Sequence, residues 1–193
     1  MNHIRPSIVL IVLFTILTGL VFPLAFVAGA GALAPGLAGG SLLSNGDTVV
    51  GSALIGQTFT KDTYFQGRPS ATTDTDPADS TKTVPAPYNA NSSGGSNMAA
   101  TSKALIDRVT PDVEKLGGGP VPGDSVTTSA SGLDPDISPG FAARQVARVA
   151  KARSMPETQV AELVARHTKG RLFGIVGQPR VNVLELNMAL DAP

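Results

Sequence analysis

Gln145 is the side chain whose surroundings most suggest chemistry. It lies between two cations, Arg144 and Arg148, in the run Ala-Arg-Gln-Val-Ala-Arg. A neutral carboxamide can donate and accept hydrogen bonds at once, to a ligand or to the backbone of a partner. The favoured alternative is a polar residue on a solvated helix face. We therefore treat Gln145 as a candidate contact residue.

A second candidate is the turn Ser93-Gly94-Gly95-Ser96, which directly precedes a predicted helix. Backbone N–H groups at a helix start have no partner within the helix, so they can bind an anion. A tight turn followed by a helix cap accounts for the same four residues and is the simpler interpretation.

Motifs for covalent or metal catalysis are absent from the sequence. Gly117–Gly119 lacks the Lys-Ser/Thr pair of a phosphate-binding loop, and neither G-x-S-x-G nor S-x-x-K occurs. Asp134-Pro135-Asp136 offers two carboxylates for calcium, but the other positions of a calcium loop are missing, and a proline turn is the usual interpretation. His167 is interpreted as structural or exposed. We assign no catalytic residue and no metal site.

Composition excludes further classes of function. The absence of cysteine excludes a disulfide framework, a thiol nucleophile, a Cys-ligated zinc and a lipidated N-terminal cysteine. The 15 basic residues are balanced by 15 acidic ones, so no basic face is expected and nucleic acid is not an expected partner. Gly29, Gly31 and Ala34 match a dinucleotide fingerprint, but the apolar run before them is too long for a strand.

The N-terminal region predicts how the chain is held. No charged residue occurs from Pro6 to Gly46, and residues 7–28 are mostly Ile, Val, Leu and Phe. A helix of that length measures roughly 33 Å, enough to cross the hydrocarbon core of a membrane. Pro23, near its far end, can kink it. Arg5 is the only flanking cation, so residues 1–6 are expected in the cytoplasm.

A cleaved signal peptide is the alternative, because small residues at 27–30 resemble a cleavage site. The apolar run exceeds the usual length of a signal, which favours a retained anchor. Either interpretation exports the rest of the chain. We expect a single-pass protein of the inner (plasma) membrane, in contact with the lipid bilayer. Residues 29–46 form a linker, and residues 47–193 form an extracytoplasmic domain.

The elements of this domain predict an α+β fold class, with the single transmembrane helix before it. Residues 48–59 indicate a strand and turn, and residues 71–87 a mobile surface loop, because they lack apolar content. Ser96 or Asn97 is expected to cap a helix that runs to about Leu116. The side chains expected to face the core from this region are Met98, Leu105, Ile106, Val109 and Val113.

The C-terminal third carries the clearest helix signals. Ser138 is expected to cap a helix with Pro139 at its first position, and Ser154 to Glu157 form a capping box that opens a second helix. Gly170 is expected to end that second helix. Residues 172–176 and 180–187 then indicate two strands joined through a Gly-Gln-Pro turn.

Taken together, these segments resemble the C subunit of the Kdp-type potassium-transporting P-type ATPase over nearly the whole chain. Two local departures are Asp136, where the family commonly has a histidine, and residues 72–87, which are longer than usual. The resemblance is carried by ordered blocks at Arg5-Pro6, Leu17–Gly19, Pro23-Leu24, Gly40–Leu42, Gly51–Gln57, Tyr64–Ala71, Tyr88-Asn89, Ser93–Asn97, Ser131–Pro135, Gln145–Ala150 and Gly177–Asn187.

The resemblance implies a role in a four-part potassium pump. Its partners would be a channel-like potassium subunit, a P-type ATPase subunit that hydrolyses ATP, and a small membrane subunit. This chain would be non-catalytic, would aid assembly, and would act as a catalytic chaperone that raises the ATP affinity of the ATPase subunit. Gln145 corresponds to the glutamine that the family implicates in nucleotide contact. No cofactor is expected on the chain alone, and potassium is the transported ion.

The predicted topology conflicts with nucleotide contact, because it places Gln145 outside the cell, where the ATP of the pump is not. An extracytoplasmic domain would instead cover the potassium entrance of the channel-like subunit. We therefore favour entrance capping and assembly as the mechanism and keep nucleotide contact as the mechanism that the resemblance implies. Without a pump, the alternatives are an exported, membrane-anchored binding domain or a secreted hydrolase.

Overall fold

The structure is a computed structural model that describes residues 3–192. The chain divides into two compact units, Met1–Ser52 and Ala53–Pro193. The first contains a long apolar helix and a short hairpin, and the second contains helices and small sheets. The predicted α+β fold class with a single N-terminal apolar helix is therefore confirmed.

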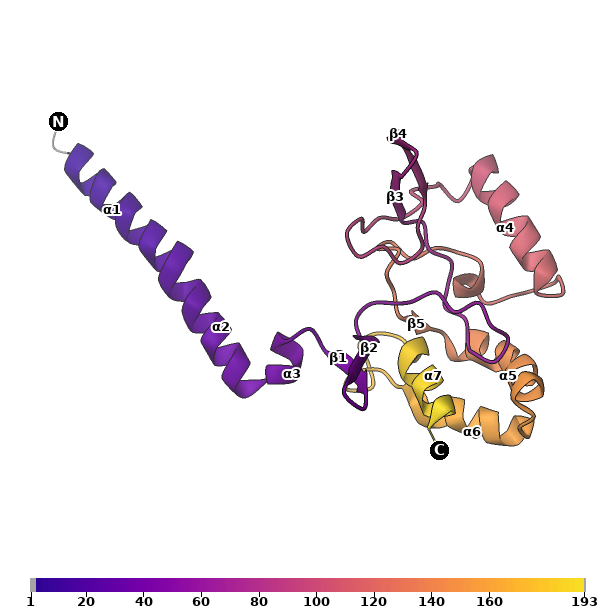
Figure 1. The fold of residues 1–193 in the computed structure, drawn as a ribbon. Coiled ribbons are helices and arrows are strands. Elements are labelled where there is room, and N and C mark those ends of the chain that lie inside the picture. The colour runs from indigo at the N-terminus through magenta and orange to yellow at the C-terminus, as the bar shows by residue number, and fades with distance from the viewer. Residues whose placement is uncertain (1–2, 193) are drawn as a thin grey trace. The chain divides into compact units, whose positions relative to one another are not determined.

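The apolar helix runs from Ile4 to Leu33 through α1 (Ile4–Ile16), the π-helical turn η1 (Leu17–Val21) and α2 (Phe22–Leu33) (Figure 1). None of its side chains is buried, and within residues 3–192 it is the one helix long and apolar enough to cross a membrane. It is longer than the predicted span 7–28. Ala34, with a non-helical φ of −146°, ends it one residue before Pro35.

The π-helical turn has a local cause in Pro23. Proline has no backbone N–H, and its ring collides with the carbonyl four residues earlier. The helix widens just before it, so that the Phe22 N–H donates to the Leu17 carbonyl, five residues back. Thr18 Oγ1 donates to the Phe14 carbonyl at 2.6 Å, which gives the hydroxyl a partner inside an apolar helix. Pro23 thus changes the helix without ending it.

Regular structure continues into the predicted linker 29–46. A short helix α3 (Pro35–Ala38) is followed by the antiparallel hairpin of β1 (Leu42–Asn45) and β2 (Thr48–Ser52). Gly46 has a φ of +58° in the turn, a conformation that favours glycine. The strand predicted from Thr48 is present, but it ends at Ser52 rather than extending toward residue 59.

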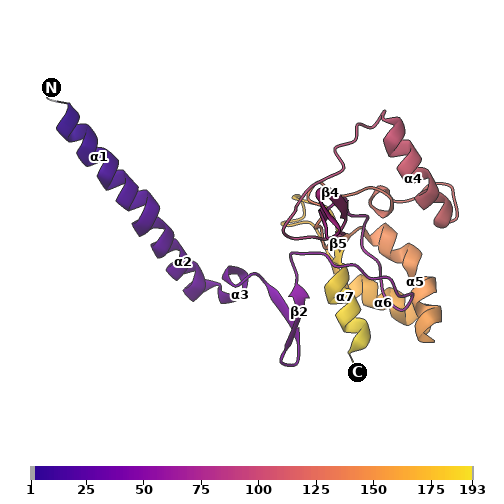
Figure 2. The ribbon, with the colours of Figure 1, turned by 45° about the horizontal axis from the view of Figure 1, so that its top comes forward.

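The core of the second unit lies where α5 (Pro139–Arg153), α6 (Glu157–His167) and α7 (Val183–Asp191) pack together (Figures 1 and 2). Burying one such aliphatic side chain contributes about 1.5–3 kcal/mol relative to exposure. The cluster comprises Phe65, Ile137, Phe141, Ala142, Val146, Val149, Ala150, Val160, Val164, Val181, Val183, Leu186 and Leu190.

A small antiparallel sheet completes the core, in the order β5–β7–β6. Its strands are β5 (Asp136–Ile137), β6 (Thr168–Lys169) and β7 (Arg180–Asn182), and Ile137 pairs with Val181 at a buried position. At the end of β7 the Asn182 Oδ1 accepts from the Glu185 N–H at 3.0 Å. This side-chain cap turns the central strand directly into α7.

The start of α5 is as predicted, with Ser138 as the cap and Pro139 at the first helical position. The Ser138 Oγ accepts from the Phe141 N–H at 3.1 Å. The carboxylate of Asp124 fixes the cap in turn, because it accepts from the Ser138 N–H at 2.6 Å and from its hydroxyl at 2.8 Å.

Four C-terminal predictions are wrong in whole or in part. Ser154 does not cap the second helix: with a φ of +55° it ends α5, and α6 begins at Glu157 after Pro156. Gly170 does not end this helix, which stops at His167. The strand predicted over 180–187 stops at Asn182, because the cap there starts a helix whose apolar spacing also resembles strand alternation. The strand predicted over 172–176 is a turn whose two end residues bridge each other.

The segment 71–87, predicted as a surface loop, contains the hairpin β3 (Thr73–Asp76) and β4 (Asp79–Pro85). Its threonines and valine are β-branched, which suits strands. The Asp76 Oδ1 accepts from the Ala78 N–H at 2.8 Å, an Asx turn that Pro77 also favours. Low apolar content indicated exposure here, not a lack of regular structure.

Helix α4 (Lys103–Lys115) begins later than predicted and lies outside the core. Its N-cap is Ser102 rather than Ser96 or Asn97, and the helix continues through Pro111. None of its residues is buried, and both views show it apart from α5–α7 (Figures 1 and 2). The core is already filled by those helices. The prediction that five apolar side chains of this region face the core is therefore wrong. They are Met98, Leu105, Ile106, Val109 and Val113.

Asn187 ties the irregular segment before β3 to α7. Its side chain is 2% exposed, its Oδ1 accepts from the Phe65 N–H at 2.8 Å, and its Nδ2 donates to the Phe65 carbonyl at 2.9 Å. One carboxamide thus satisfies both polar groups of a residue whose ring is fully buried.

Replacing Asn187 with alanine leaves the Phe65 N–H and carbonyl unpaired inside the core. We expect the free energy of unfolding of Asn187→Ala to fall by about 2–4 kcal/mol. Chemical unfolding of the full chain in detergent, followed by circular dichroism, measures this value. Asn91→Ala, at an exposed position, is the matched control and should change stability by less than about 0.5 kcal/mol. Equal losses of unfolding free energy in the two variants would contradict the role of the Asn187 side chain in pairing the Phe65 backbone.

Candidate functional site

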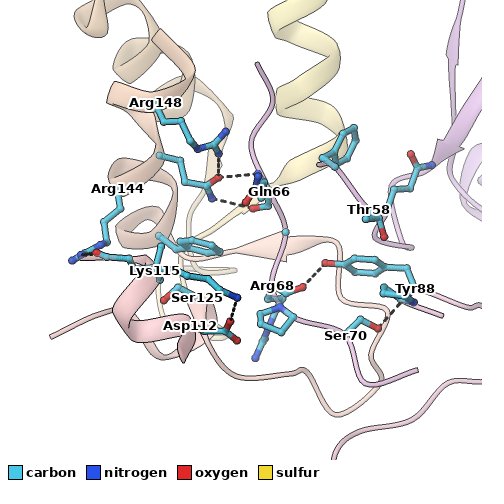
Figure 3. A pocket seen from close by; sticks show the side chains of 18 residues that line it. Thr58, Gln66, Arg68, Ser70, Tyr88, Asp112, Lys115, Ser125, Arg144 and Arg148 are labelled. Carbon is cyan, nitrogen blue, oxygen red and sulfur yellow. Dashed lines mark hydrogen bonds and ion pairs between the residues drawn. The ribbon is translucent and has the colours of Figure 1, made fainter. Parts of the chain in front are cut away.

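A cleft of about 810 Å³ opens in the second unit, a volume within the range of small-molecule sites (Figure 3). Its walls come from parts of the chain that are distant in sequence, which the fold brings together. The lining consists of Gln57, Thr58, Phe59, Gln66, Gly67, Arg68, Pro69, Ser70, Pro87, Tyr88, Asp112, Lys115, Leu116, Ser125, Phe141, Arg144, Gln145 and Arg148.

The charged side chains of the cleft are mostly cations. Arg68, Lys115, Arg144 and Arg148 line it together with one carboxylate, Asp112. Three of these cations form ion pairs, Arg68 with Asp134, Lys115 with Asp112 and Arg148 with Asp62, so within residues 3–192 Arg144 is the one cation of the lining without an ion pair. A cation without an ion pair in a cleft attracts the opposite sign, so an anion is the ligand that this lining suits.

Gln145 lies in this cleft and is not on a solvated helix face, because its side chain is only 5% exposed. Its Oε1 accepts from the Gln66 N–H at 2.8 Å, and its Nε2 donates to the Gln66 carbonyl at 3.0 Å. Arg148 Nη2 also donates to Oε1, at 2.6 Å. The amide therefore binds a backbone, as one sequence alternative proposed, but a backbone of its own chain. Nucleotide contact through Gln145 stays a prediction.

Two arginines of α5 extend this attachment along the same segment. Arg148 donates to the Asp62 carbonyl at 2.8 Å and to the Tyr64 carbonyl at 3.1 Å, and Arg153 Nε donates to the Thr63 carbonyl at 2.6 Å. Residues 62–66 have no strand or helix of their own, so these side chains supply the hydrogen bonds that a sheet would otherwise provide. Burial lowers the pKa of Arg148, and the nearby Asp62 carboxylate opposes that shift.

Tyr88 holds the chain just beyond this segment, at Arg68 and Ser70. Its hydroxyl donates to the Arg68 carbonyl at 2.6 Å, and its N–H donates to the Ser70 Oγ at 3.0 Å, as the dashed lines in Figure 3 show. An added Cβ would collide with the Tyr88 ring at Gly56 and with the Tyr88 hydroxyl at Gly67, so the close approach requires glycine at both positions. Burial and, to a smaller extent, the Asp134 carboxylate raise the pKa of Tyr88 to about 12 against a lowering by Arg68, so the hydroxyl keeps its proton and stays a donor.

Arg68 joins the cleft to the predicted Asp134-Pro135-Asp136 turn. Its Nη1 lies 2.8 Å from the Asp134 carboxylate, and within residues 3–192 its buried Nε has no hydrogen-bond partner. Asp136 pairs with Arg180 at 2.9 Å, and burial raises the pKa of this carboxyl while Arg180 lowers it. Both carboxylates thus pair with arginines, and the described part of the chain holds no group of three metal-ligating side chains.

The turn Ser93–Ser96 does not line the cleft, and no helix starts there, so its predicted place at a helix start is wrong. The Gly94 N–H and the Ser93 hydroxyl both donate to the Ser131 carbonyl, at 2.9 and 3.0 Å. Gly95 packs on Ala130, whose carbonyl oxygen would lie 2.9 Å from an added Cβ. Anion binding by this turn stays a prediction, with one of its N–H groups already in use.

The chemistry that the cleft supports is binding. Both serine hydroxyls of the lining are engaged as structural donors: Ser70 Oγ donates to the Gly132 carbonyl at 2.7 Å and Ser125 Oγ to the Pro122 carbonyl at 2.6 Å. Neither His3 nor His167 is among its lining residues. The sequence identified Gln145 as a candidate but not Arg68 or Tyr88. The blocks Tyr64–Ala71 and Tyr88-Asn89 contain these two residues, but nothing local linked the blocks to each other or to α5.

Comparison with known proteins gives matches over the full chain. A family model described as "K+-transporting ATPase, c chain" matches residues 4–192. The chain is 60% identical to the potassium-transporting ATPase KdpC subunit of Rhodopseudomonas palustris (strain BisB18), over 100% of this chain and 98% of the relative. It is 58% identical to that of Methylobacterium nodulans and 60% to that of Bradyrhizobium diazoefficiens, each over 99% of this chain and 97% of the relative.

Replacing Gln145 with alanine should release the backbone of Gln66 from α5. We expect Gln145→Ala to lose about 1–3 kcal/mol of unfolding free energy, because two backbone groups lose their partner. Trypsin should also cleave after Lys61 faster than in the unchanged chain. Gln159→Ala, at an exposed position of α6, is the matched control and should behave as the unchanged chain in both assays. Unchanged stability and cleavage in Gln145→Ala would show that the amide does not hold the segment.

Proposed function

The chain belongs to the family of the c chain of K+-transporting ATPases, and on that premise we propose that it is a non-catalytic accessory subunit of a high-affinity, ATP-driven potassium uptake pump. The observation that carries the proposal is the exposed apolar helix Ile4–Leu33, which the family match includes together with the folded domain. An apolar surface of that length requires lipid or other membrane helices around it.

The charges around this helix support one orientation. Arg5 precedes the apolar run, no charge follows until residue 47, and that charge is an aspartate. Cations favour the cytoplasmic side of a membrane helix, so residues 1–6 lie in the cytoplasm and residues 47–193 lie outside the cell. The chain is then a single-pass protein of the inner (plasma) membrane.

In this orientation the domain stands on the side from which potassium enters. It packs on the channel-like subunit, covers the potassium entrance and supports assembly of the pump. The anchor helix packs against membrane helices of the other subunits, including the ATPase subunit and the small membrane subunit. Gly19 supports such packing, because nothing lies within 4 Å of a Cβ built there, and glycine lets a neighbouring helix approach closely.

A second candidate function is to raise the ATP affinity of the P-type ATPase subunit, and the cationic cleft favours it. Arg144 forms no ion pair within residues 3–192 and suits a phosphate oxygen, and the buried Nε of Arg68 is an unused donor within the same residues. Gln145 lies in the wall of the same cleft. This function requires that the domain reach ATP, so the side of the membrane on which it lies decides between the two candidates.

Deleting residues 7–28 should abolish incorporation into the pump, because the domain loses its place in the bilayer. We expect the amount that co-purifies with the other subunits to fall at least about tenfold. A chain whose residues 7–28 are replaced by an unrelated apolar helix is the control that separates simple tethering from specific helix packing. Co-purification of the deleted chain at normal yield would refute the role of the anchor.

Cysteine labelling in intact cells measures the orientation, because the chain has no cysteine of its own. Ser80→Cys places a thiol on the exposed β4 strand, and we expect a membrane-impermeant maleimide to label it without permeabilisation. His3→Cys, before the helix, is the matched control and should be labelled only after permeabilisation. The reverse pattern would overturn entrance capping and favour the nucleotide function.

A further inference from the structure

The chain stays apolar beyond its long apolar helix, in residues 33–52, here named the juxtamembrane segment. This segment contains the last residue of α2, the short helix α3 and the β1–β2 hairpin. Four of its apolar side chains are exposed: Leu33 by 89%, Leu37 by 74%, Leu42 by 59% and Val49 by 56%. Residues 3–192 do not cover them, and exposed apolar side chains gathered in so short a segment mark an interaction site.

Helix α3 is closed by hydrogen bonds of its own backbone. The Ser41 N–H donates to the Gly36 carbonyl at 2.8 Å, and the Gly40 N–H donates to the Leu37 carbonyl at 3.2 Å. Together with a φ of +87° at Gly40, these two bonds form a Schellman motif. The carbonyl groups at the end of this helix are therefore paired inside the turn. Such a turn suits a medium that offers few hydrogen-bond partners to a backbone.

The hairpin is attached to this turn. The Ser52 Oγ donates to the Gly40 carbonyl at 2.7 Å, so the end of β2 is fixed to the end of α3. In the hairpin register Leu42 lies opposite Ser52, and Ser44 lies opposite Val49. Leu42 and Val49 therefore share one face of the two-stranded ribbon. The juxtamembrane segment is thus an ordered structure that holds its exposed apolar side chains in fixed places.

Charge is absent from most of this segment. No charged residue occurs from Pro6 to Gly46, and the first one, Asp47, lies in the turn of the hairpin. Burial of a charge in an apolar medium is costly, so a surface without charge enters the boundary between headgroups and acyl chains at little cost. The segment also has no cation, so its contact with lipid requires no anionic headgroup.

The length of the apolar helix brings α3 to the level of the headgroups. The 30 residues of Ile4–Leu33 rise roughly 45 Å, whereas the hydrocarbon core of a bilayer is about 30 Å thick and the headgroup layers bring it to about 40–45 Å. The helix therefore reaches from one headgroup layer to the other. Ala34, with its non-helical φ of −146°, changes the direction of the chain there, and α3 follows at once (Figure 1).

We propose that the juxtamembrane segment lies in the outer headgroup layer of the bilayer. Leu33 and Leu37 enter the upper acyl chains, and the face that carries Leu42 and Val49 lies against the bilayer. This inference rests on the proposed function, which keeps the helix in the membrane. It gives the chain a second membrane contact just before the second unit begins at Ala53.

Two observations favour lipid over a partner protein as the cover of this segment. The segment continues directly from a helix whose whole surface is apolar and exposed, so the lipid around that helix extends over α3. Its paired backbone and its lack of charge also leave little for a protein to recognise by hydrogen bonds or ion pairs, whereas the acyl chains of a lipid need neither.

Quenching of a fluorescent label by lipid tests the proposal on the full chain, which has no cysteine of its own. Leu37→Cys carries nitrobenzoxadiazole, and the chain is placed in phosphatidylcholine vesicles that contain doxyl-labelled phosphatidylcholine. We expect strong quenching that does not change in 1 M salt, because no charge takes part. Ile106→Cys, at a residue 57% exposed on α4, is the matched control and should not be quenched.

Two further measurements separate the possible outcomes. Leu20→Cys, in the middle of the apolar helix, reports whether the helix is in the bilayer. Quenching at position 20 but not at position 37 would overturn this inference alone, whereas no quenching at position 20 would contradict the proposed function. The label at position 37 is then measured in the assembled pump. Quenching that persists there supports the lipid contact, and quenching that is lost there would show that another subunit covers the segment and would overturn it.

Substitution of the two leucines gives a second readout. With the label on Val49→Cys, we expect Leu33→Asn with Leu37→Asn to reduce quenching by lipid at least about twofold, because the apolar contact with the acyl chains is lost. Ile106→Asn with Leu172→Asn removes two equally large exposed side chains elsewhere and should leave the quenching unchanged. All four positions are exposed, so the thermal unfolding midpoint should stay the same. Equal quenching in the two double variants would overturn the proposal.

Discussion

The fold of the second unit depends on hydrogen bonds from side chains to the backbone of residues 62–66, which form no strand or helix. Two carboxamides from different helices hold adjacent residues: Asn187 of α7 pairs with Phe65, and Gln145 of α5 pairs with Gln66. Each makes both hydrogen bonds that a neighbouring strand would make. The segment can therefore cross the core with its peptide groups paired, place the Phe65 ring at full burial, and join α5 to α7.

The same attachment forms one wall of the cationic cleft. Arg148 serves two purposes there, since it lines the cleft and also fastens the Asp62 and Tyr64 carbonyls. Charges that look available in the sequence are thus partly committed to holding the fold. Part of the polar chemistry of the cleft therefore maintains the shape of the second unit.

The sequence predicted those features that depend on neighbouring residues. The apolar helix and the Ser138 cap of α5 follow from local composition and spacing. The burial of Gln145 does not, because its partner lies 79 positions away along the chain. The apolar pattern after Asn182 fitted both a strand and a helix, and the Asn182 side-chain cap is what starts helix α7 there. For α4 the apolar stripe was visible, but no local signal indicated that the core was already occupied.

The π-helical turn before Pro23 has a geometric consequence for the anchor. One additional residue in a helical turn rotates everything beyond it by about 100° about the helix axis. A side-chain stripe that faces one direction along α1 therefore faces another along α2. A single membrane helix with such an offset presents two differently oriented surfaces at two depths. It can therefore pack against one neighbouring helix along α1 and against a different one along α2.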